Sequence, residues 1–177
     1  YDLKKSGGFT CSHLHFGDKK IRSTYLVTTP NFVACHVPAY LHLYDVLKGL
    51  KMGGSFLLNS IWDEEETKNH LPDSMKKYMA ENEIKFYIIN GTKLGEEIGL
   101  GTRTNTIMQS AFFKITEVIP YEMAVDQMKS AIVKSYGRKG EHIVNMNYAA
   151  VDAGGKNVIE VKVPAEWKDI VVADDNG

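Results

Sequence analysis

The stretch GGSFLLNSIWDEEE, from Gly53 to Glu66, combines a turn, a buried strand and the start of a helix. Gly53 and Gly54 predict the turn, and the apolar run SFLLNS that follows is typical of a buried strand. DEEE, from Asp63 to Glu66, indicates a helix opening, because carboxylates are stabilised at the positive end of the helix macrodipole. Acidic groups at adjacent helix positions do not face each other, so this run is not a catalytic carboxylate pair.

Two further apolar runs of strand length flank this unit: FVACH from Phe32 to His36, and IKFYIIN from Ile84 to Asn90. Helical patterns alternate with these runs. One helical segment is expected after Pro72, and Pro38 suits the first turn of another. Apolar residues recur at helical spacing in the segment after Pro38, namely Tyr40, Leu43, Leu47 and Leu50.

A long helical pattern runs from Gly91 to about Ala149, with breaks at GLGTRTN (Gly99 to Asn105), at Pro120 and at YGRKG. One of these helices is expected to bury a face of mostly small residues, namely Ala124, Met128, Ala131 and Ser135. VIEVKVP, from Val158 to Pro164, alternates and predicts a final strand. Buried strands alternating with helices predict a layered α/β/α fold.

The N-terminal part predicts an early β-hairpin. Residues 10–16 alternate between two faces, GDKK reads as a turn, and residues 21–25 return as an antiparallel strand. This register places one set of side chains on the same face, namely His13, His15, Arg22 and Thr24. An antiparallel hairpin joined to buried parallel strands predicts an open mixed sheet.

Size and composition limit the classes of protein. The chain has 177 residues, which favours one domain over residues 1–177, with a frayed tail over residues 168–177. A net charge of −1 argues against a nucleic-acid-binding protein. The two cysteines, Cys11 and Cys35, cannot form a disulfide framework or a four-cysteine cluster, and they suit a reducing compartment. The sequence contains no bilayer-spanning run and no signal peptide, so we expect a cytoplasmic protein without membrane contact.

Two segments could bind an anion. In GLGTRTN, glycines would let the backbone approach a ligand, the following helix would present its N–H groups, and Arg103 could grip a phosphate or carboxylate. The alternative is a glycine-rich turn between helices with a Thr or Asn cap. The basic turn formed by Lys19, Lys20 and Arg22 is either a phosphate contact or a solvated hairpin tip.

The histidines and cysteines carry weaker hypotheses. His13 and His15 could ligate a metal from one strand face, but exposed or hydrogen-bonded histidines are the simpler interpretation. His36 ends an apolar strand, where α/β proteins place ligand-facing residues, but a satisfied edge residue is the simpler interpretation. Both cysteines are interpreted as small core side chains. We therefore predict no catalytic residue and no metal ligand in this chain.

Several long blocks, in order, resemble the gamma-type (third) domain of the pyruvate:ferredoxin (flavodoxin) oxidoreductases. They are KKSGGFTCSHLHFG, IRSTYLV, FVACH, YDVLKGLKMGGSFLLNSIWD, HLP, EIGLGTRTNTIMQSAFFK and VNMNYAAVDAG. The resemblance runs from about Tyr1 to Trp167. It implies a fragment that lacks the first strand–helix unit of its domain.

The resemblance implies that the whole enzyme decarboxylates pyruvate oxidatively to acetyl-CoA and passes electrons to ferredoxin or flavodoxin. It also implies thiamine diphosphate, magnesium and iron–sulfur clusters, held in other domains of the same polypeptide, and a homodimer of the full-length protein. The fragment alone is expected to be inactive. A related 2-oxoacid oxidoreductase with another substrate remains an alternative.

The resemblance further implies that this domain helps to bind coenzyme A and packs against other domains. The positions with matching chemistry for its phosphates are Lys19, Lys20, Arg22, Arg103 and Asn105. Two departures stand beside them: His15 replaces an expected Arg, and GDKK replaces a proline-containing turn. A purely structural interface domain without a ligand is the alternative.

Overall fold

A five-stranded mixed sheet forms the centre of the computed structural model, which describes residues 26–29, 31–42, 46–47, 49–101 and 104–172. The strands follow one another across the sheet in chain order. They are β1 (Leu26–Thr29), β2 (Phe32–Cys35), β3 (Ser55–Asn59), β4 (Lys85–Ile89) and β5 (Ile159–Val161). β2, β3 and β4 are parallel, while β1 and β5 run antiparallel at the two ends.

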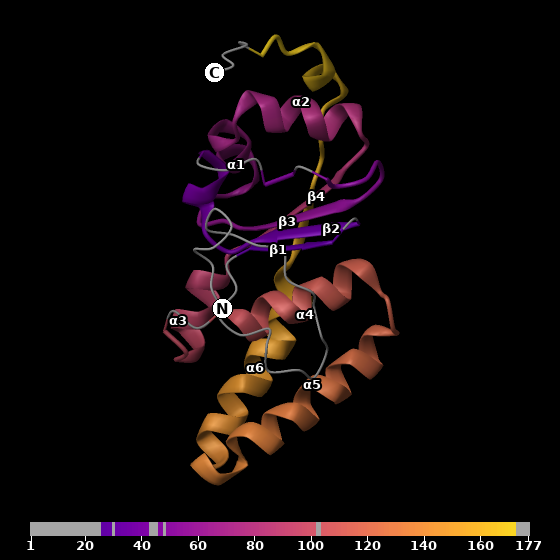
Figure 1. The fold of residues 1–177 in the computed structure, drawn as a ribbon. Coiled ribbons are helices and arrows are strands. Elements are labelled where there is room, and N and C mark those ends of the chain that lie inside the picture. Colours follow the sequence, from indigo (N-terminus) through magenta and orange to yellow (C-terminus); the bar gives the residue numbers. More distant parts are fainter. Residues whose placement is uncertain (1–25, 30, 43–45, 48, 102–103, 173–177) are drawn as a thin grey trace, which may run out of the picture.

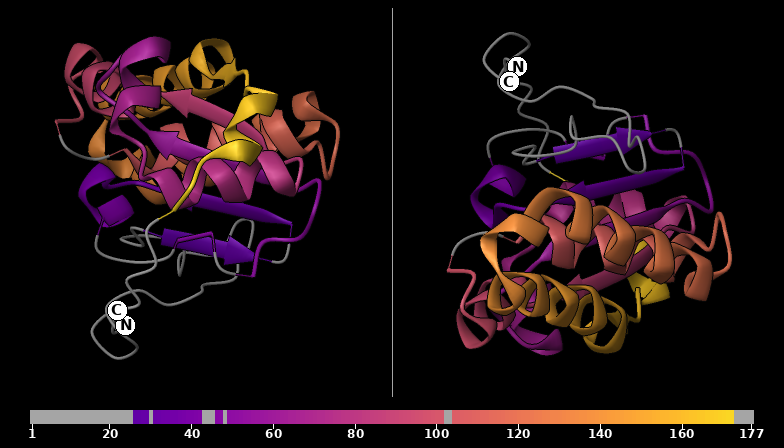
Figure 2. Two further views of the ribbon diagram at one scale, coloured as in Figure 1. Left: turned by 90° about the horizontal axis from the view of Figure 1, so that it is seen from above. Right: turned by 90° about the horizontal axis from the view of Figure 1, so that it is seen from below.

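Helices cover both faces of this sheet, as Figures 1 and 2 show. On one side lie α1 (Glu64–His70), α2 (Asp73–Glu81) and the 3₁₀ helix η4 (Ala165–Asp169). On the other side lie α3 (Gly91–Ile98), α4 (Asn105–Thr116), α5 (Tyr121–Tyr136) and α6 (Glu141–Asn157). Two shorter 3₁₀ helices complete the described elements, η2 (Pro38–His42) and η3 (Gly137–Lys139). The expected layered α/β/α fold with an open mixed sheet is confirmed.

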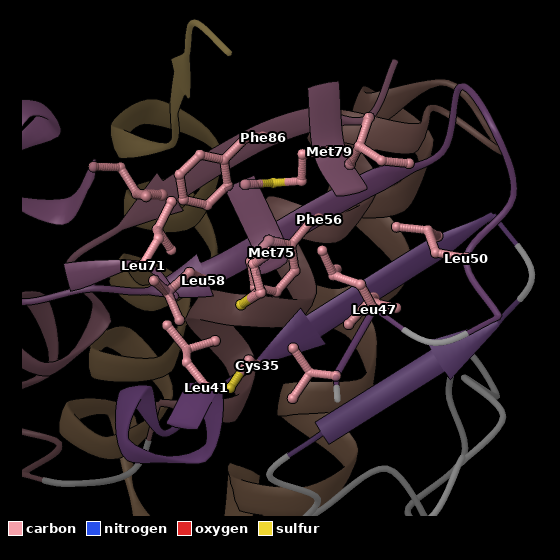
Figure 3. Close-up of a cluster of buried hydrophobic side chains, with 14 of the residues drawn as sticks. Cys35, Leu41, Leu47, Leu50, Phe56, Leu58, Leu71, Met75, Met79 and Phe86 are labelled. Carbon is pink, nitrogen blue, oxygen red and sulfur yellow. The ribbon is translucent and has the colours of Figure 1, made fainter. Parts of the chain in front are cut away.

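The alternation of side chains along the central strands produces two buried cores. Phe56 and Phe86 stack at 5.4 Å between ring centroids on the face covered by α2, where Met75 and Met79 pack over them (Figure 3). The opposite face carries Leu57, Ile89 and their neighbours against α4, α5 and α6. Because β2, β3 and β4 each contribute to both cores, these parallel strands are buried on both sides, as parallel strands require.

The end of the described chain is tied back to α2. The Lys77 ammonium donates to the carbonyl oxygens of Lys168 at 2.7 Å and Ile170 at 3.0 Å. The Trp167 ring packs on the first core and lies beneath the Lys76 ammonium at 5.6 Å. The segment after β5 therefore forms a strap across the outer side of α2.

Most of the expected elements are present, and the differences have physical reasons. An early antiparallel pair exists as β1 and β2, whereas the hairpin predicted around GDKK lies outside the described residues. The helix expected after Pro38 is wrong beyond His42, because Val46 and Leu47 lie in turns and still reach the core.

The buried face expected on α5 is wrong at its C-terminal end. Ala124 and Met128 are buried as expected, but Ser135 is exposed and Ile132 is buried. The apolar side chain takes the buried place because it gains from leaving water, whereas the serine hydroxyl remains solvated.

The α4–α6 contact depends on the absence of a side chain at Gly154. A Cβ atom there would collide with the Ile107 carbonyl and with Ser110, whose hydroxyl bonds to the Val151 carbonyl. We therefore expect Gly154→Ala to lower the free energy of unfolding by about 2 kcal/mol, because backbone atoms cannot move aside. Urea unfolding followed by circular dichroism measures this change.

Gly137→Ala is the matched control, because its Cβ would meet only the Val133 side chain at an ordinary 3.7 Å. Its free energy of unfolding should stay within about 1 kcal/mol of the parent value. Equal effects of the two substitutions would contradict the proposed close packing of α4 on α6.

Candidate functional site

The carboxyl ends of β2, β3 and β4 meet at one edge of the sheet, which we call the carboxyl edge. The segments that leave the strands there begin with His36, Ser60 and Asn90. In open α/β sheets this edge is where ligands bind, because loops and helix N-termini converge there. The carboxyl edge is therefore the candidate site.

Asn59 joins the three parallel strands at this edge. Its side-chain nitrogen donates to the His36 carbonyl at 3.1 Å and to the Thr92 hydroxyl at 3.3 Å. Its side-chain oxygen accepts from the Gly91 backbone N–H at 2.8 Å. Only 5% of Asn59 is exposed, so water cannot reach these polar groups. Each of the three bonds therefore supplies a partner that a buried polar group needs. The side chain thus fixes where α3 starts relative to β2 and β3.

Two helix N-termini lie side by side at the carboxyl edge. Asn90 caps α3 by accepting from the Lys93 N–H at 3.0 Å. α4 begins at Asn105 after Thr104, which makes no side-chain cap bond. A Cβ built on Gly91 would lie 3.6 Å from the Thr104 Cβ, so the two helix starts are in contact. Their macrodipoles both present positive ends here, which favours an anion.

His36 contributes a neutral group to the carboxyl edge. It is partly buried, and burial lowers its pKa from 6.5 to about 4, because a low-dielectric surrounding disfavours the charged imidazole. Its imidazole is therefore uncharged near neutral pH. It can form hydrogen bonds with a ligand but adds no fixed positive charge.

Cys35 is an inert neighbour of this site. Its thiol donates to the Val37 carbonyl at 3.1 Å, and burial raises its pKa to about 12. The thiolate is the form that attacks substrates and binds metals, so a protonated buried thiol does not suit either task. The interpretation of Cys35 as a core side chain is confirmed, because it belongs to the first buried cluster.

The residues proposed from the sequence fall into two groups. Asn105 is placed at the start of α4, half-buried, on the carboxyl edge. The four proposed cations lie outside the described residues, namely Lys19, Lys20, Arg22 and Arg103. His13, His15 and Cys11 also lie outside them. GLGTRTN does connect two helices, α3 and α4, with Gly99 at a positive φ of 106°.

Sequence reasoning missed Asn59 and a stacked pair formed by Trp62 and His70. Asn59 appeared only as the last residue of an apolar run, and its three partners are distant in the sequence. The strand-end position of a polar residue was the available signal. Among the described residues, no group of three or more His, Cys, Asp and Glu side chains could hold a metal ion. In the same part of the chain, no helix is long and apolar enough to cross a membrane.

Comparisons with known proteins agree on one family. The model of the family "Pyruvate ferredoxin/flavodoxin oxidoreductase" matches residues 1–156. The pyruvate:ferredoxin oxidoreductase of Moorella thermoacetica is 52% identical over 171 residues, which is 97% of this chain and 15% of that protein. The pyruvate-flavodoxin oxidoreductase of Enterobacter agglomerans is 49% identical over 95% of this chain and 14% of its own length.

A relative with a different name is similar over the same segment. The pyruvate dehydrogenase [NADP(+)] of Cryptosporidium parvum is 44% identical over 94% of this chain and 9% of its own length. Among solved structures, the pyruvate oxidoreductase subunit PORC of Thermotoga maritima has a TM-score of 0.58 at 17% identity. The match covers 76% of this chain and 67% of that subunit, and it supports the fold alone. The chain thus spans 9% to 15% of the length of these three curated relatives.

Replacement of the Asn59 amide by a carboxylate tests the junction between the strands. In Asn59→Asp, the donor to the His36 carbonyl becomes a buried acceptor, so we expect the free energy of unfolding to fall by about 3 kcal/mol at pH 7. The exposed Asn157→Asp is the control with the same chemistry and should cost less than about 1 kcal/mol. Chemical denaturation at pH 7 measures both, and a small effect at Asn59 would contradict the role assigned to it.

His36 predicts a specific loss of stability in mild acid. Below pH 6.5 the unfolded chain binds a proton at this position, while the folded chain does so only near its lowered pKa of about 4. As the pH is lowered from 6.5 toward 4, the free energy of unfolding should therefore fall by about 1.4 kcal/mol per pH unit. His36→Gln should remove this contribution, and denaturation curves at pH 7, 6 and 5 test it. Identical pH dependence in parent and variant would show that His36 is not desolvated.

Proposed function

The chain belongs to the pyruvate ferredoxin/flavodoxin oxidoreductase family, and we propose that it serves as the coenzyme A-binding domain of an enzyme that oxidises pyruvate. The whole enzyme would convert pyruvate and coenzyme A to acetyl-CoA and CO₂ and pass two electrons to an acceptor. The small share of each relative that this segment matches supports a division of labour among domains. This chain would supply binding and packing surfaces, and other domains the redox chemistry.

The choice of electron acceptor is assigned to those other domains. The names of these relatives mention ferredoxin, flavodoxin and NADP(+). Each relative is nevertheless at least 44% identical to this chain over at least 94% of this chain's length. We infer that a segment shared by relatives named for different acceptors is not the part that selects among them. Ferredoxin or flavodoxin would therefore contact the enzyme through other surfaces, and the whole enzyme is expected to be a homodimer.

The carboxyl edge is the observation that carries the coenzyme A proposal. Coenzyme A is a polyanion, and the adjacent N-termini of α3 and α4 favour negative charge at this edge. Asn105 starts α4 there, and Arg103 precedes it by two residues in the sequence. We assign Lys19, Lys20 and Arg22 to further phosphate contacts, on the family resemblance of their segment.

Thiamine diphosphate, magnesium and iron–sulfur clusters are assigned to the rest of the polypeptide. The one described cysteine does not fit a cluster, because its pKa of about 12 keeps the Cys35 thiol protonated and it lies buried in a packed core. The 2-oxoacid itself would also bind elsewhere. The equivalent domain of another 2-oxoacid oxidoreductase remains the alternative on this point.

A purely structural role is the second candidate function. Three large apolar side chains are about half exposed on α5 and on the turn before it, namely Val118, Met123 and Val133. We infer that these side chains pack against a neighbouring domain of the whole enzyme. This role requires no ligand, so coenzyme A binding separates the two candidates.

Calorimetric titration of the chain with coenzyme A tests the proposal. We expect salt-sensitive binding that weakens about tenfold in Arg103→Ala and in Lys20→Ala, because each removes a charge-assisted contact with a phosphate. Lys51→Ala, four residues before β3 and so at the opposite, amino end of the parallel strands, removes an exposed charge and should leave the affinity unchanged. The chain alone should not decarboxylate pyruvate. Binding that is absent, or equally weakened in all three variants, would favour the structural role.

A further inference from the structure

Trp62 and His70 form a stacked aromatic pair at the surface. Their ring centroids are 3.7 Å apart and their planes differ by 4°, so the imidazole lies flat on the indole. Trp62 follows β3 by three residues, and His70 is the last residue of α1. The pair therefore lies where the chain leaves the carboxyl edge and enters the first covering helix.

Buried hydroxyl groups hold the Trp62 backbone in place. Its N–H donates to the Ser60 hydroxyl at 3.1 Å, and its carbonyl accepts from the Thr67 hydroxyl at 3.2 Å. Ser60 is 1% exposed and Thr67 is fully buried, and their hydroxyls are 2.7 Å apart. The His70 carbonyl accepts from His42 Nε2 at 3.1 Å. These bonds preorganise the pair before any ligand arrives.

The pair is not needed to fill a core. Trp62 is not among the described residues that pack against the two buried clusters, whereas Trp167 packs against the first. Trp62 is only partly buried, His70 and His42 are exposed, and the adjacent Ile61 is 59% exposed. A large aromatic side chain that is rigidly held but contributes to neither core is available for contact with a partner.

We propose that the Trp62–His70 pair is a stacking platform for a nucleotide base, the adenine of coenzyme A. Flat, exposed aromatic rings bind bases because every base presents a π face of similar size. This inference rests on the proposed function, since it adds a base contact to the phosphate contacts assigned there. It also explains a feature that phosphate binding leaves without a role.

The position of the pair suits such a ligand. The Ser60 N–H bonds to the Ile89 carbonyl at 2.9 Å, so the segment that leads to Trp62 lies beside the end of β4 and the start of α3. Trp62 follows Asn59 by three residues, which limits the separation of their Cα atoms to about 11 Å. A ribose and its phosphates are long enough to connect a base on Trp62 with the helix N-termini near Asn59.

The tryptophan content of the chain makes this stacking directly measurable. The chain has two tryptophans, so Trp167→Phe leaves Trp62 as the single indole fluorophore, and Trp62→Phe leaves Trp167. We expect coenzyme A and adenosine 3′,5′-bisphosphate to quench the fluorescence of the Trp167→Phe variant. Pantetheine 4′-phosphate, which has a phosphate but no base, should quench neither variant.

Affinity measurements give an independent readout. Trp62→Leu should weaken binding of adenosine 3′,5′-bisphosphate about tenfold and leave pantetheine 4′-phosphate unaffected, because only the base loses its stacking partner. Trp62→Phe keeps a smaller ring and should fall between parent and Trp62→Leu. Trp167→Phe is the matched control on the outer side of α2. Circular dichroism of each variant confirms that its fold is retained.

The possible outcomes separate this inference from the proposed function. Coenzyme A could bind in a salt-sensitive way without quenching Trp62 fluorescence and with the same affinity in Trp62→Leu as in the parent. This result would overturn the stacking platform but leave the phosphate site standing. No binding of any of the three probes overturns both. Equal loss of affinity for all three probes in Trp62→Leu would also overturn the platform, because it indicates a general structural effect.

Discussion

The buried amide of Asn59 is the constraint on which the arrangement of the carboxyl edge depends. A side chain with two donors and one acceptor site in use satisfies a strand end, a helix hydroxyl and a helix N–H at once. None of these groups could remain buried without a partner at small cost. Two of these bonds fix the start of α3, and the start of α4 lies against it at Gly91, so the electrostatic character of the candidate site follows from a structural requirement.

The two cores make this edge rigid. Successive residues of β3, such as Phe56 and Leu57, enter opposite cores, so neither helical layer can shift without disturbing the other.

The order of the strands has a further effect. Each parallel crossover advances the sheet by one strand, and the antiparallel β1 and β5 complete its two ends. The segments of the candidate site therefore gather at the carboxyl ends of β2, β3 and β4.

Local sequence patterns predicted β2 to β5 and most helices, because Ser55–Asn59 and Lys85–Ile89 are short apolar runs and Asp63 is a strong helix cap. They failed where tertiary packing decides, as in the turns at Val46 and Leu47. Of the described residues at the carboxyl edge, the sequence singled out His36 and Asn105. The roles of Asn59, Trp62 and His70 depend on partners brought together by the fold, and periodicity carries no information about such pairs.

The strap held by Lys77 has a consequence for the order of folding. Its two hydrogen bonds join residues that are 91 and 93 positions apart in the chain. Closing so long a loop costs entropy that is recovered only after the intervening segment, with β4 and the whole α3–α6 layer, has already condensed. The strap is therefore expected to form last. A nascent chain would keep the outer side of α2 uncovered until residues 165–170 had emerged.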